Sequence, residues 1–519
     1  MSKLTAIRLG DYDDMWPKRV SKQAGEVGLE AEIYRTRVWI HNQHPRRERG
    51  LVFHDGWEAW RCWLGPNQAS IAFGPRRRYL DGKGCADYRR EFKILGGRDR
   101  PLPPMDLIAR TLELVDSMSR TFGPAVELQV EDEDALRFVR RHGPMGHSSV
   151  QVKLVEHYFK NGILLGDPEP IVLVVDTVPG VPGYSSDFHD RLKRVAGQWN
   201  INQLSVHTAA LARLETRLAE LDAGESPKRR VAVVLCLGPR EDHTPTRTLE
   251  VMRRLDQYGL RWRRAHSDDD RRWSVRDQFG SVLQALQAPL FTITYGAGKS
   301  LPWTIGIDLS HPHGSDTSTV AAALLDPGGS FVHAWTTTQR RDESISPPRL
   351  RSLLREASSS IDCLDPDAGV LIVRDGRLFE QENPRSYVDD LGRPATLVEV
   401  RKRMNPIAVD ESNQPASCTI HAIDRHDGNE QVRFLSPATT TGPSGGQSGR
   451  GVLKITWRRD LDGLELDECI PRVLLSHYFT PGLGLHQRNL PGPLYWADGI
   501  ASASEYDFRF RGQPVTQID

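Results

Sequence analysis

The hydrophobic pattern divides the chain into three parts. In the first part, apolar and polar residues alternate over residues 36–42, 48–56 and 68–75, which is the period of half-buried strands. Residues 104–123 instead repeat apolar positions at helical spacing. Strands and a helix in this order predict a mixed α/β module, which we place at residues 1–165.

From about residue 166, continuous apolar runs replace the alternating pattern. Residues 168–177 and 229–239 are rich in Val, Leu and Ile, as the buried strands of parallel sheets are. Residues 187–197 and 207–224 have helical periodicity. Strands that alternate with helices form a doubly wound sheet, and we expect residues 277–296 to close it as a helical segment.

In the last part, apolar runs stop at carboxylates. Asp308 ends one such run and Asp375 ends another. Glu343 lies in a polar stretch between them, and Asp498 lies in the apolar segment 491–503. We expect each of the four at the mouth of a strand-like segment, which is where α/β folds place their chemistry.

Four converging carboxylates form an oxygen-only site that suits Mg²⁺ or Mn²⁺. Two such ions can hold both the attacking and the leaving oxygen of a phosphodiester displacement. A single Asp at a strand end is more often a helix cap or a loop residue, and Asp375 followed by Gly376 is by itself a turn signal. The set of four therefore predicts a nuclease, although no member does so alone.

Length and charge limit the number of domains and the kinds of partner that the chain can have. The chain has 519 residues, which suggests about three domains. Lys plus Arg and Asp plus Glu balance at 68 each, but Arg35 to Arg100 contains 15 basic residues against 7 acidic ones, with six aromatic residues among them: Trp39, Trp57, Trp60, Trp63, Phe73 and Tyr79. This segment is either a nucleic-acid surface with stacking platforms or a solvated basic face over a Trp-rich core.

Cysteine usage and hydropathy indicate the compartment. The six cysteines are scattered, without the spacing of a zinc site or a disulfide framework. The N-terminus leads into no signal-like apolar stretch, and no window is long and apolar enough to span a membrane. We therefore expect a soluble, cytoplasmic protein with no membrane partner.

Five segments in the last part resemble, in the same order, the PIWI domain of Argonaute proteins, which has an RNase H-like fold. They are LPWTIGIDLSHPHG, RDESISPPRLRSLLREA, LIVRDGRLFEQE, TLVEVRKRMNPIAV and LSHYFTPGLGLHQRNLPGPLYWADGIA. The resemblance implies a catalytic tetrad of Asp308, Glu343, Asp375 and Asp498, with the Glu on a mobile finger. Asp308, Asp375 and Asp498 would hold two Mg²⁺ or Mn²⁺ ions. The implied activity is guide-directed cleavage of a complementary strand, in prokaryotic defence against invading DNA.

The segment before it resembles the MID domain of the same family in position and pattern. The resemblance implies a Rossmann-like domain at residues 166–300 that binds the guide 5′ end, before a PIWI-like domain at residues 301–519. Candidate ligands of that end are His243, Arg247, Arg263 and Lys299, an Arg-rich departure from the family's usual set. Two further residues are candidates for contacts with the nucleic-acid backbone: Lys402 and Arg403.

Several alternatives stay open at this stage. About 165 residues cannot hold both the N-terminal and the PAZ domain of long Argonautes, so we expect no PAZ domain and consider a separately encoded protein partner. The chain is then either a guided endonuclease or a guide-binding sensor that activates another effector subunit. An unguided RNase H-like nuclease is a third reading. The sequence leaves the chemistry of guide and target, DNA or RNA, undecided.

Overall fold

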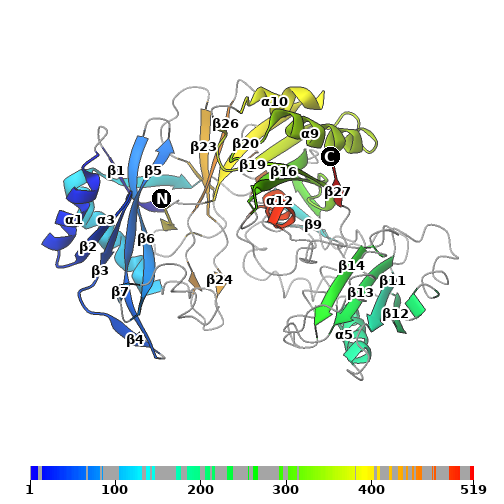
Figure 1. The fold of residues 1–519 in the computed structure, drawn as a ribbon, viewed down its shortest axis with the longest axis horizontal. Coiled ribbons are helices and arrows are strands. Elements are labelled where there is room, and N and C mark those ends of the chain that lie inside the picture. Colours follow the sequence, from blue (N-terminus) through cyan, green and yellow to red (C-terminus); the bar gives the residue numbers. More distant parts are fainter. Residues whose placement is uncertain are drawn as a thin grey trace. The chain divides into compact units, whose positions relative to one another are not determined.

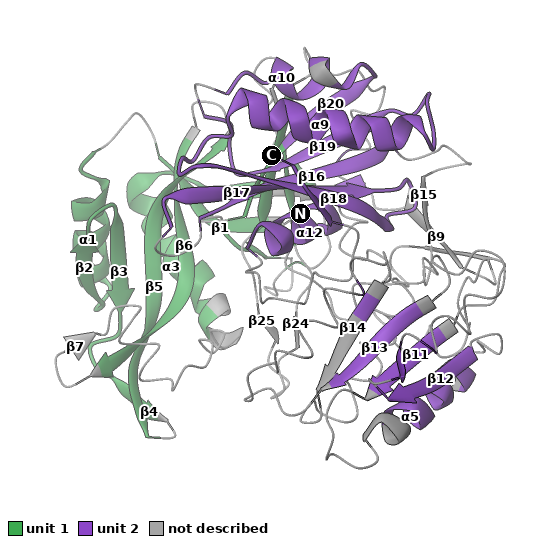
Figure 2. Cartoon of the chain, turned by 45° about the vertical axis from the view of Figure 1, so that its right-hand side comes forward, with its two compact units in different colours: residues 1–132, 399–460 green, residues 133–398, 461–519 purple. Residues whose placement is uncertain are grey.

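A computed structural model gives the fold of this protein (Figure 1). It describes residues 2–9, 14–48, 50–65, 68–81, 84–85, 105–130, 136–140, 143–146, 171–176, 184–198, 205–210, 213–214, 216, 231–237, 255, 261–266, 292–295, 302–311, 315–379, 382–402, 406–409, 416, 420–422, 430–436, 440–441, 447–448, 452–458, 470, 473–474, 490–502 and 515–518. The chain divides into two compact units (Figure 2), one of Met1–Asp132 with Glu399–Asp460 and one of Glu133–Val398 with Leu461–Asp519.

The first unit contains an antiparallel sheet on which the helices α1 and α3 pack, and a separate two-stranded sheet of β24 and β25. Its elements are β1 (Ser2–Arg8), α1 (Trp16–Glu26), β2 (Glu30–Tyr34), β3 (Arg37–His41), β4 (Arg46–Glu48), β5 (Leu51–Gly65), β6 (Gln68–Asp81), β7 (Gly84–Cys85), α3 (Met105–Phe122), β8 (Ala125–Val130), β21 (Ala408–Val409), β22 (Ile420–Ala422), β23 (Glu430–Leu435), β24 (Thr440–Thr441), β25 (Gln447–Ser448) and β26 (Leu453–Arg458). The strands and the helix predicted for residues 36–123 are confirmed.

Alternation along β5 decides which face of this sheet is buried under the helices. Trp57 and Ala59 point toward α1 and α3 and join a core with Val20 and Leu114. The indole Nε1 of Trp57 donates to Thr111 Oγ1 on α3 at 2.9 Å, which satisfies a polar group that burial would otherwise leave unpaired.

The chain returns to this unit after an interval of several hundred residues. Strand β21 pairs with β1, and β22 pairs with β8. Leu4 and Ala6 of β1 share a buried cluster with Val432 and Phe434 of β23. Residues 399–460 thus complete the core that the N-terminal strands begin.

The second unit contains the predicted RNase H-like sheet. Its elements are β9 (Leu136–Arg140), β10 (Gly143–Gly146), β11 (Ile171–Asp176), α5 (Tyr184–Gln198), β12 (Ser205–Ala210), β13 (Val231–Leu237), β14 (Arg261–His266), β15 (Thr292–Tyr295), β16 (Trp303–Ser310), β17 (Thr317–Leu325), β18 (Phe331–Arg340), α9 (Pro347–Asp362), β19 (Val370–Asp375), α10 (Arg385–Val388), a 3-10 turn (Asp389–Leu391), β20 (Ala395–Arg401), α12 (Gly492–Ser502) and β27 (Val515–Gln517). Strands β16, β17 and β18 are antiparallel, and β19 lies parallel to β16 on its other side.

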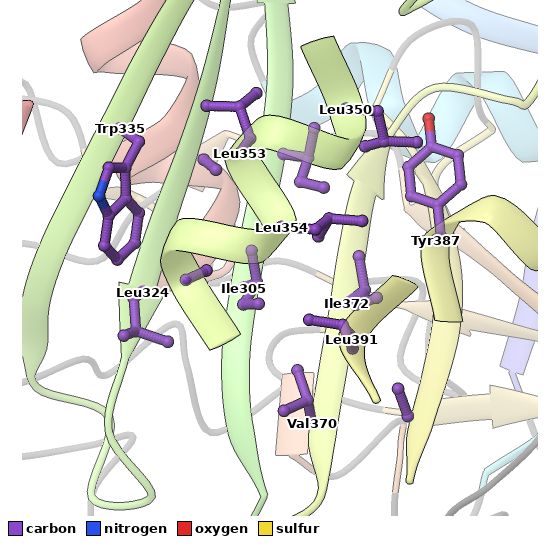
Figure 3. Close-up of a cluster of buried hydrophobic side chains, with 14 of the residues drawn as sticks. Ile305, Leu324, Trp335, Leu350, Leu353, Leu354, Val370, Ile372, Tyr387 and Leu391 are labelled. Atoms are coloured by element: carbon purple, nitrogen blue, oxygen red, sulfur yellow. The ribbon is translucent and has the colours of Figure 1, made fainter. Parts of the chain in front are cut away.

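Helices cover both faces of this sheet. On one face, Leu353 and Leu354 of α9 pack against Ile305 and Ile372 (Figure 3). On the other face, Trp496 and Ala497 of α12 pack against the small residues Ala321 and Ala323. Side chains alternate along a strand. The odd-numbered residues of β16 therefore point to the α9 face, and the even-numbered residues point to the α12 face.

A second sheet of four parallel strands has the order β12-β11-β13-β14, with α5 packed on β11 and β12. This is the predicted Rossmann-like pattern, but two local predictions were wrong. Residues 207–210 form the end of strand β12 rather than the start of a helix. Residues 292–295 form strand β15, which pairs with β9. Tertiary strand pairing overrides helical periodicity at both places.

Among the described residues, no helix has both the length and the apolar character that crossing a membrane requires. The predicted division into 1–165, 166–300 and 301–519 stays a prediction.

Candidate active site

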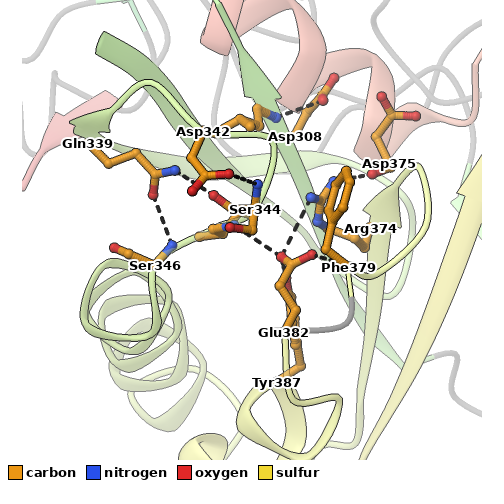
Figure 4. Close-up of polar contacts among 12 residues, drawn as sticks. Asp308, Gln339, Asp342, Ser344, Ser346, Arg374, Asp375, Phe379, Glu382 and Tyr387 are labelled. Carbon is orange, nitrogen blue, oxygen red and sulfur yellow. Dashed lines mark hydrogen bonds and ion pairs between the residues drawn. The ribbon is translucent and has the colours of Figure 1, made fainter. Parts of the chain in front are cut away.

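Asp308 and Asp375 lie at the ends of neighbouring parallel strands. Ile307 of β16 is paired in register with Arg374 of β19, and each Asp is the next residue along its strand. Because side chains alternate, both carboxylates fall on the α12 face of the sheet. Asp308 is buried, with 4 % of its surface exposed, and its Oδ1 accepts a hydrogen bond from the Leu309 amide at 2.7 Å. Figure 4 shows both side chains.

We expected Asp498 at a strand end, but it lies within helix α12. Two of its contacts with β16 show how the helix lies along the strand. A Cβ atom added to Gly306 would lie only 2.1 Å from the Pro493 carbonyl oxygen, so the helix meets the strand almost backbone to backbone there. At the other end, Ser502 Oγ donates to Ser310 Oγ at 3.3 Å.

These two contacts place Asp498 along the sheet. The helical segment between them, at about 1.5 Å per residue, and the strand segment between them, at about 3.3 Å per residue, each span about 13 Å. Asp498 lies just past the middle of its segment, and Asp308 lies at the middle of its own. We infer that the backbone of Asp498 lies at about the level of Asp308 along the sheet.

Glu343 lies in the loop between β18 and α9, and its side chain is 71 % exposed. Its Oε1 lies 3.3 Å from His311 Nε2, and His311 Nδ1 lies 2.7 Å from the Ser318 hydroxyl on β17. The adjacent Asp342 has a different contact. Its Oδ1 accepts a hydrogen bond from the Ser344 amide at 3.1 Å, and hydrogen bonding from Ser344 lowers the pKa of the Asp342 carboxyl.

A buried polar cluster lies on the opposite, α9 face of the sheet, next to Arg374 (Figure 4). Glu382 is its centre, with 2 % of its side chain exposed. Glu382 Oε1 accepts hydrogen bonds from the Ile345 amide at 3.1 Å and the Tyr387 hydroxyl at 2.9 Å. Its Oε2 accepts one from the Phe379 amide at 2.9 Å. Arg374 Nη2 lies 3.6 Å from Oε1 of the same carboxylate.

The protonation of this cluster follows from burial and charge. Burial alone would lower the pKa of the Arg374 guanidinium, but the neighbouring Tyr387 and Glu382 outweigh it and raise that pKa. Burial likewise raises the pKa of the Tyr387 hydroxyl. The guanidinium therefore stays charged and forms an ion pair with Glu382, and the phenol stays neutral and donates a hydrogen bond to Glu382.

The carboxylates suit a hard divalent cation. Mg²⁺ is commonly held by one or two carboxylates together with waters and substrate phosphates, and the pair of Asp308 and Asp375 fits that requirement. Within the described part of the chain, no group of three or more His, Cys, Asp or Glu side chains is close enough together to hold a metal ion.

The candidates for the guide 5′ end are only partly described. His243, Arg247 and Lys299 lie outside the described residues, as does the backbone candidate Arg403. Arg263 lies on β14, paired in register with Val234. Lys402 directly follows β20 and is half-buried. Of these six candidates, the structure thus describes Lys402 and the backbone of Arg263.

The basic segment of the first unit is partly neutralised within its own sheet. Two carboxylates each meet two arginines: Glu58 with Arg37 and Arg76, and Asp55 with Arg46 and Arg77. Five of the six aromatic residues named for this segment are at most 9 % exposed, and the sixth, Trp63, is 44 % exposed. Of the two readings, these contacts favour a Trp-rich core under a charged face.

Three residues of the site were not found from the sequence. His311 follows Asp308 in the stretch DLSHP, where a His just past a strand end is a usable signal. Gln339 holds the Glu343 loop, because its Nε2 donates to the Ser344 carbonyl at 2.6 Å and its Oε1 accepts from the Ser346 amide at 3.0 Å. Glu382 had no signal, since its partners come from three separate segments.

No family model and no curated protein matches this chain. Solved structures do resemble it. Marinitoga piezophila Argonaute, in complex with a 5′ OH guide RNA and target DNA, matches with a TM-score of 0.66 at 11 % identity, over 96 % of this chain and 87 % of that one. Kluyveromyces polysporus Argonaute with a guide RNA matches with a TM-score of 0.60 at 10 % identity, over 93 % and 77 %. Drosophila Piwi matches with a TM-score of 0.60 at 11 % identity, over 95 % and 84 %.

Proposed function

We propose that this chain, which has the fold of Argonaute proteins, is a nucleic-acid-guided endonuclease. One observation carries the proposal: Asp308 and Asp375 lie side by side at the ends of the parallel strands β16 and β19. A carboxylate pair at this position serves phosphodiester hydrolysis. The neighbouring Rossmann-like sheet gives the fold a place to hold a guide, which an unguided nuclease does not need.

Each residue has a role in this proposal. Asp308 and Asp375 would hold a Mg²⁺ or Mn²⁺ ion against the scissile phosphate, with Asp498 completing the ligands for a second one. When bound, these ions supply Lewis acidity and activate the attacking water. Burial of Asp308 and its bond from the Leu309 amide keep the carboxylate in one orientation, which limits the reorganisation needed during the reaction.

Glu343 would complete the site from its loop. The contact with His311 supports this role over one for Asp342, because His311 lies three residues beyond Asp308 and links the loop to the catalytic strand. Asp342 is engaged with the backbone of its own loop. A resting position on His311 also leaves Glu343 free to approach once a guide–target duplex is bound.

Base pairing would supply the specificity, while the protein contacts the backbone. The Marinitoga piezophila protein binds a 5′ OH guide RNA and target DNA. Because the Arg-rich candidate set departs from the usual phosphate pocket, guides with 5′ OH and 5′ phosphate ends both belong in the test. Arg263 and Lys402 are the described candidates for guide and backbone contacts.

The test begins with sequencing of the nucleic acid that copurifies with the wild-type protein and with Asp308→Ala. We expect short strands of narrow length in both preparations. Loaded with a matching guide, the wild type should cleave a target in Mg²⁺ or Mn²⁺, whereas Asp308→Ala and Asp375→Ala should lose at least about a thousandfold in rate, as removal of central catalytic groups does.

Glu343→Gln and Asp342→Asn form a matched pair in the same assay. We expect Glu343→Gln to lose cleavage and Asp342→Asn to keep it, because Asn retains the oxygen that accepts from Ser344. Full cleavage by Asp308→Ala would contradict the assignment of the site.

A second function is favoured by a different observation. Glu343 is largely exposed, and no three carboxylates are gathered in the described residues. A guide-binding sensor that activates a separate effector subunit would tolerate such a site. Guide loading without cleavage by the wild type would support this function, and with it a separately encoded partner. Defence against invading DNA is the role we propose for either activity.

A further inference from the structure

Glu382 is a buried carboxylate whose role the proposed reaction does not explain. It lies in the loop between β19 and α10, belongs to no helix or strand, and has 2 % of its side chain exposed. Burying a charge is costly unless partners compensate it. Glu382 has four partners, two of them backbone amides, so the surrounding structure is built to keep a carboxylate there.

The two amides come from loops that carry different catalytic candidates. Ile345 lies two residues beyond Glu343, in the loop before α9, and bonds to Oε1. Phe379 lies four residues beyond Asp375, in the loop after β19, and bonds to Oε2. One carboxylate therefore spans two loops that no strand pairing holds together.

The charge of Glu382 is also connected to the catalytic strand. Arg374 pairs with Glu382 and donates to the backbone carbonyl of its neighbour Asp375. A shift of the carboxylate would thus move the guanidinium and, through it, the end of β19. The contacts run from the Glu343 loop through one side chain to the strand that ends in Asp375.

We propose that Glu382 is a positioning residue that sets the place of the Glu343 loop relative to Asp375. The inference rests on the proposed endonuclease function for its kinetic consequence. Displacement of a catalytic group by about 1 Å typically costs a hundredfold in rate, and Glu382 is the residue that holds both loops to a common point.

The experiment compares Glu382→Asp and Glu382→Gln with Glu356→Gln, an exposed carboxylate on α9. Glu382→Asp keeps a negative charge near Arg374 but shortens the side chain by one methylene. It therefore tests the position of the carboxylate without leaving the buried guanidinium unpaired. Glu382→Gln keeps one acceptor oxygen and loses the charge. Hydrogen exchange is measured over residues 341–350 and 376–383 of the full-length protein, and single-turnover cleavage is measured for the titrated active fraction.

We expect amide exchange in both segments to become at least about fivefold faster together in Glu382→Asp and Glu382→Gln. The cleavage rate constant of the active fraction should fall at least about tenfold, with half-saturating target concentration within twofold of wild type. Glu356→Gln should match wild type in every readout. If Glu382→Gln does not fold, the exchange and cleavage results for Glu382→Asp alone test the positioning role.

Two outcomes would overturn the inference: unchanged exchange in the two segments, or a smaller active fraction with an unchanged rate constant, which would mark a purely structural role. A wild type that cleaves no target with any guide would refute the proposed endonuclease instead. In that case the coupled exchange of the two segments, which needs no activity, still decides whether Glu382 joins the loops.

Discussion

At the scale of single residues, burial changes the chemistry of His421. This side chain lies on β22 with no exposed surface, and its Nε2 lies 2.7 Å from Ser436 Oγ. Burial lowers its pKa from 6.5 to about 4. Between these values the folded protein keeps the imidazole neutral, while the unfolded chain binds a proton.

The sign of the pH effect follows. Since the unfolded chain binds more protons below pH 6.5, acid favours unfolding, and stability is lost progressively as the pH falls toward the folded pKa of about 4. From pH 7 to pH 5 we expect His421 to account for a loss of about 2 kcal/mol. Urea unfolding at both pH values should show a smaller loss in His421→Gln. His44→Gln, at an exposed position, should keep the wild-type loss, and equal losses in all three proteins would contradict the argument.

Single-residue chemistry was predictable where it depended on the local sequence. Asp308 and Asp375 were found because an apolar run that stops at a carboxylate is a local signal, and the structure brings the two together. Glu382 was not, because its surroundings come from Ile345, Arg374 and Tyr387, which the fold alone assembles. The contact of Glu343 with His311 likewise joins two segments that only the fold brings together.

At the scale of elements, the position of α12 depends on one glycine. The Cβ of an alanine at Gly306 would fall 2.1 Å from the Pro493 carbonyl oxygen and 2.3 Å from its carbon. These are backbone atoms, so no side chain can rotate away. Gly306→Ala must therefore push α12, and with it Asp498, away from β16.

We expect Gly306→Ala to destabilise the protein by about 1–3 kcal/mol, as overpacked cores do, and to lower the cleavage rate about a hundredfold because Asp498 is displaced. Gly197→Ala is the matched control, since a Cβ on this α5 residue meets nothing within 4 Å. Thermal unfolding and guided cleavage measure both effects. Wild-type cleavage by Gly306→Ala would show that α12 does not need this close approach.

The sequence predicted most strands but misplaced this helix, and the reason is its environment. Helix α12 is buried along most of its length, including Trp496, Ala497 and Ile500. A helix that is apolar on nearly every side has no amphipathic period to recognise. The strand β12 was missed for the opposite reason, because its sequence runs directly into a segment with helical spacing while pairing with β11 fixes it as a strand.

At the scale of the whole molecule, the first unit is assembled from two distant stretches of chain. Thr5 Oγ1 accepts a hydrogen bond from the Ile407 amide at 3.0 Å, and the Thr5 amide donates to the Ile407 carbonyl at 2.9 Å. Hydrophobic patterning identifies a strand but does not specify a partner that lies about 400 residues away. A boundary drawn along the sequence at residue 165 therefore could not anticipate that residues 399–460 complete the same core.

This arrangement predicts how the chain tolerates being cut. A fragment of residues 133–519 would expose the apolar surface of Val432 and Phe434 that Leu4 and Ala6 cover in the intact chain. Exposed apolar patches of this kind promote aggregation.

We expect the fragment to aggregate alone in size-exclusion chromatography, and to be recovered as a one-to-one complex when residues 1–132 are coexpressed as a separate chain. Leu4→Asp in the shorter chain should abolish that recovery, because it places a charge in the shared core. A monomeric 133–519 fragment that unfolds cooperatively at the temperature of the full chain would mean that residues 399–460 do not depend on the N-terminal strands.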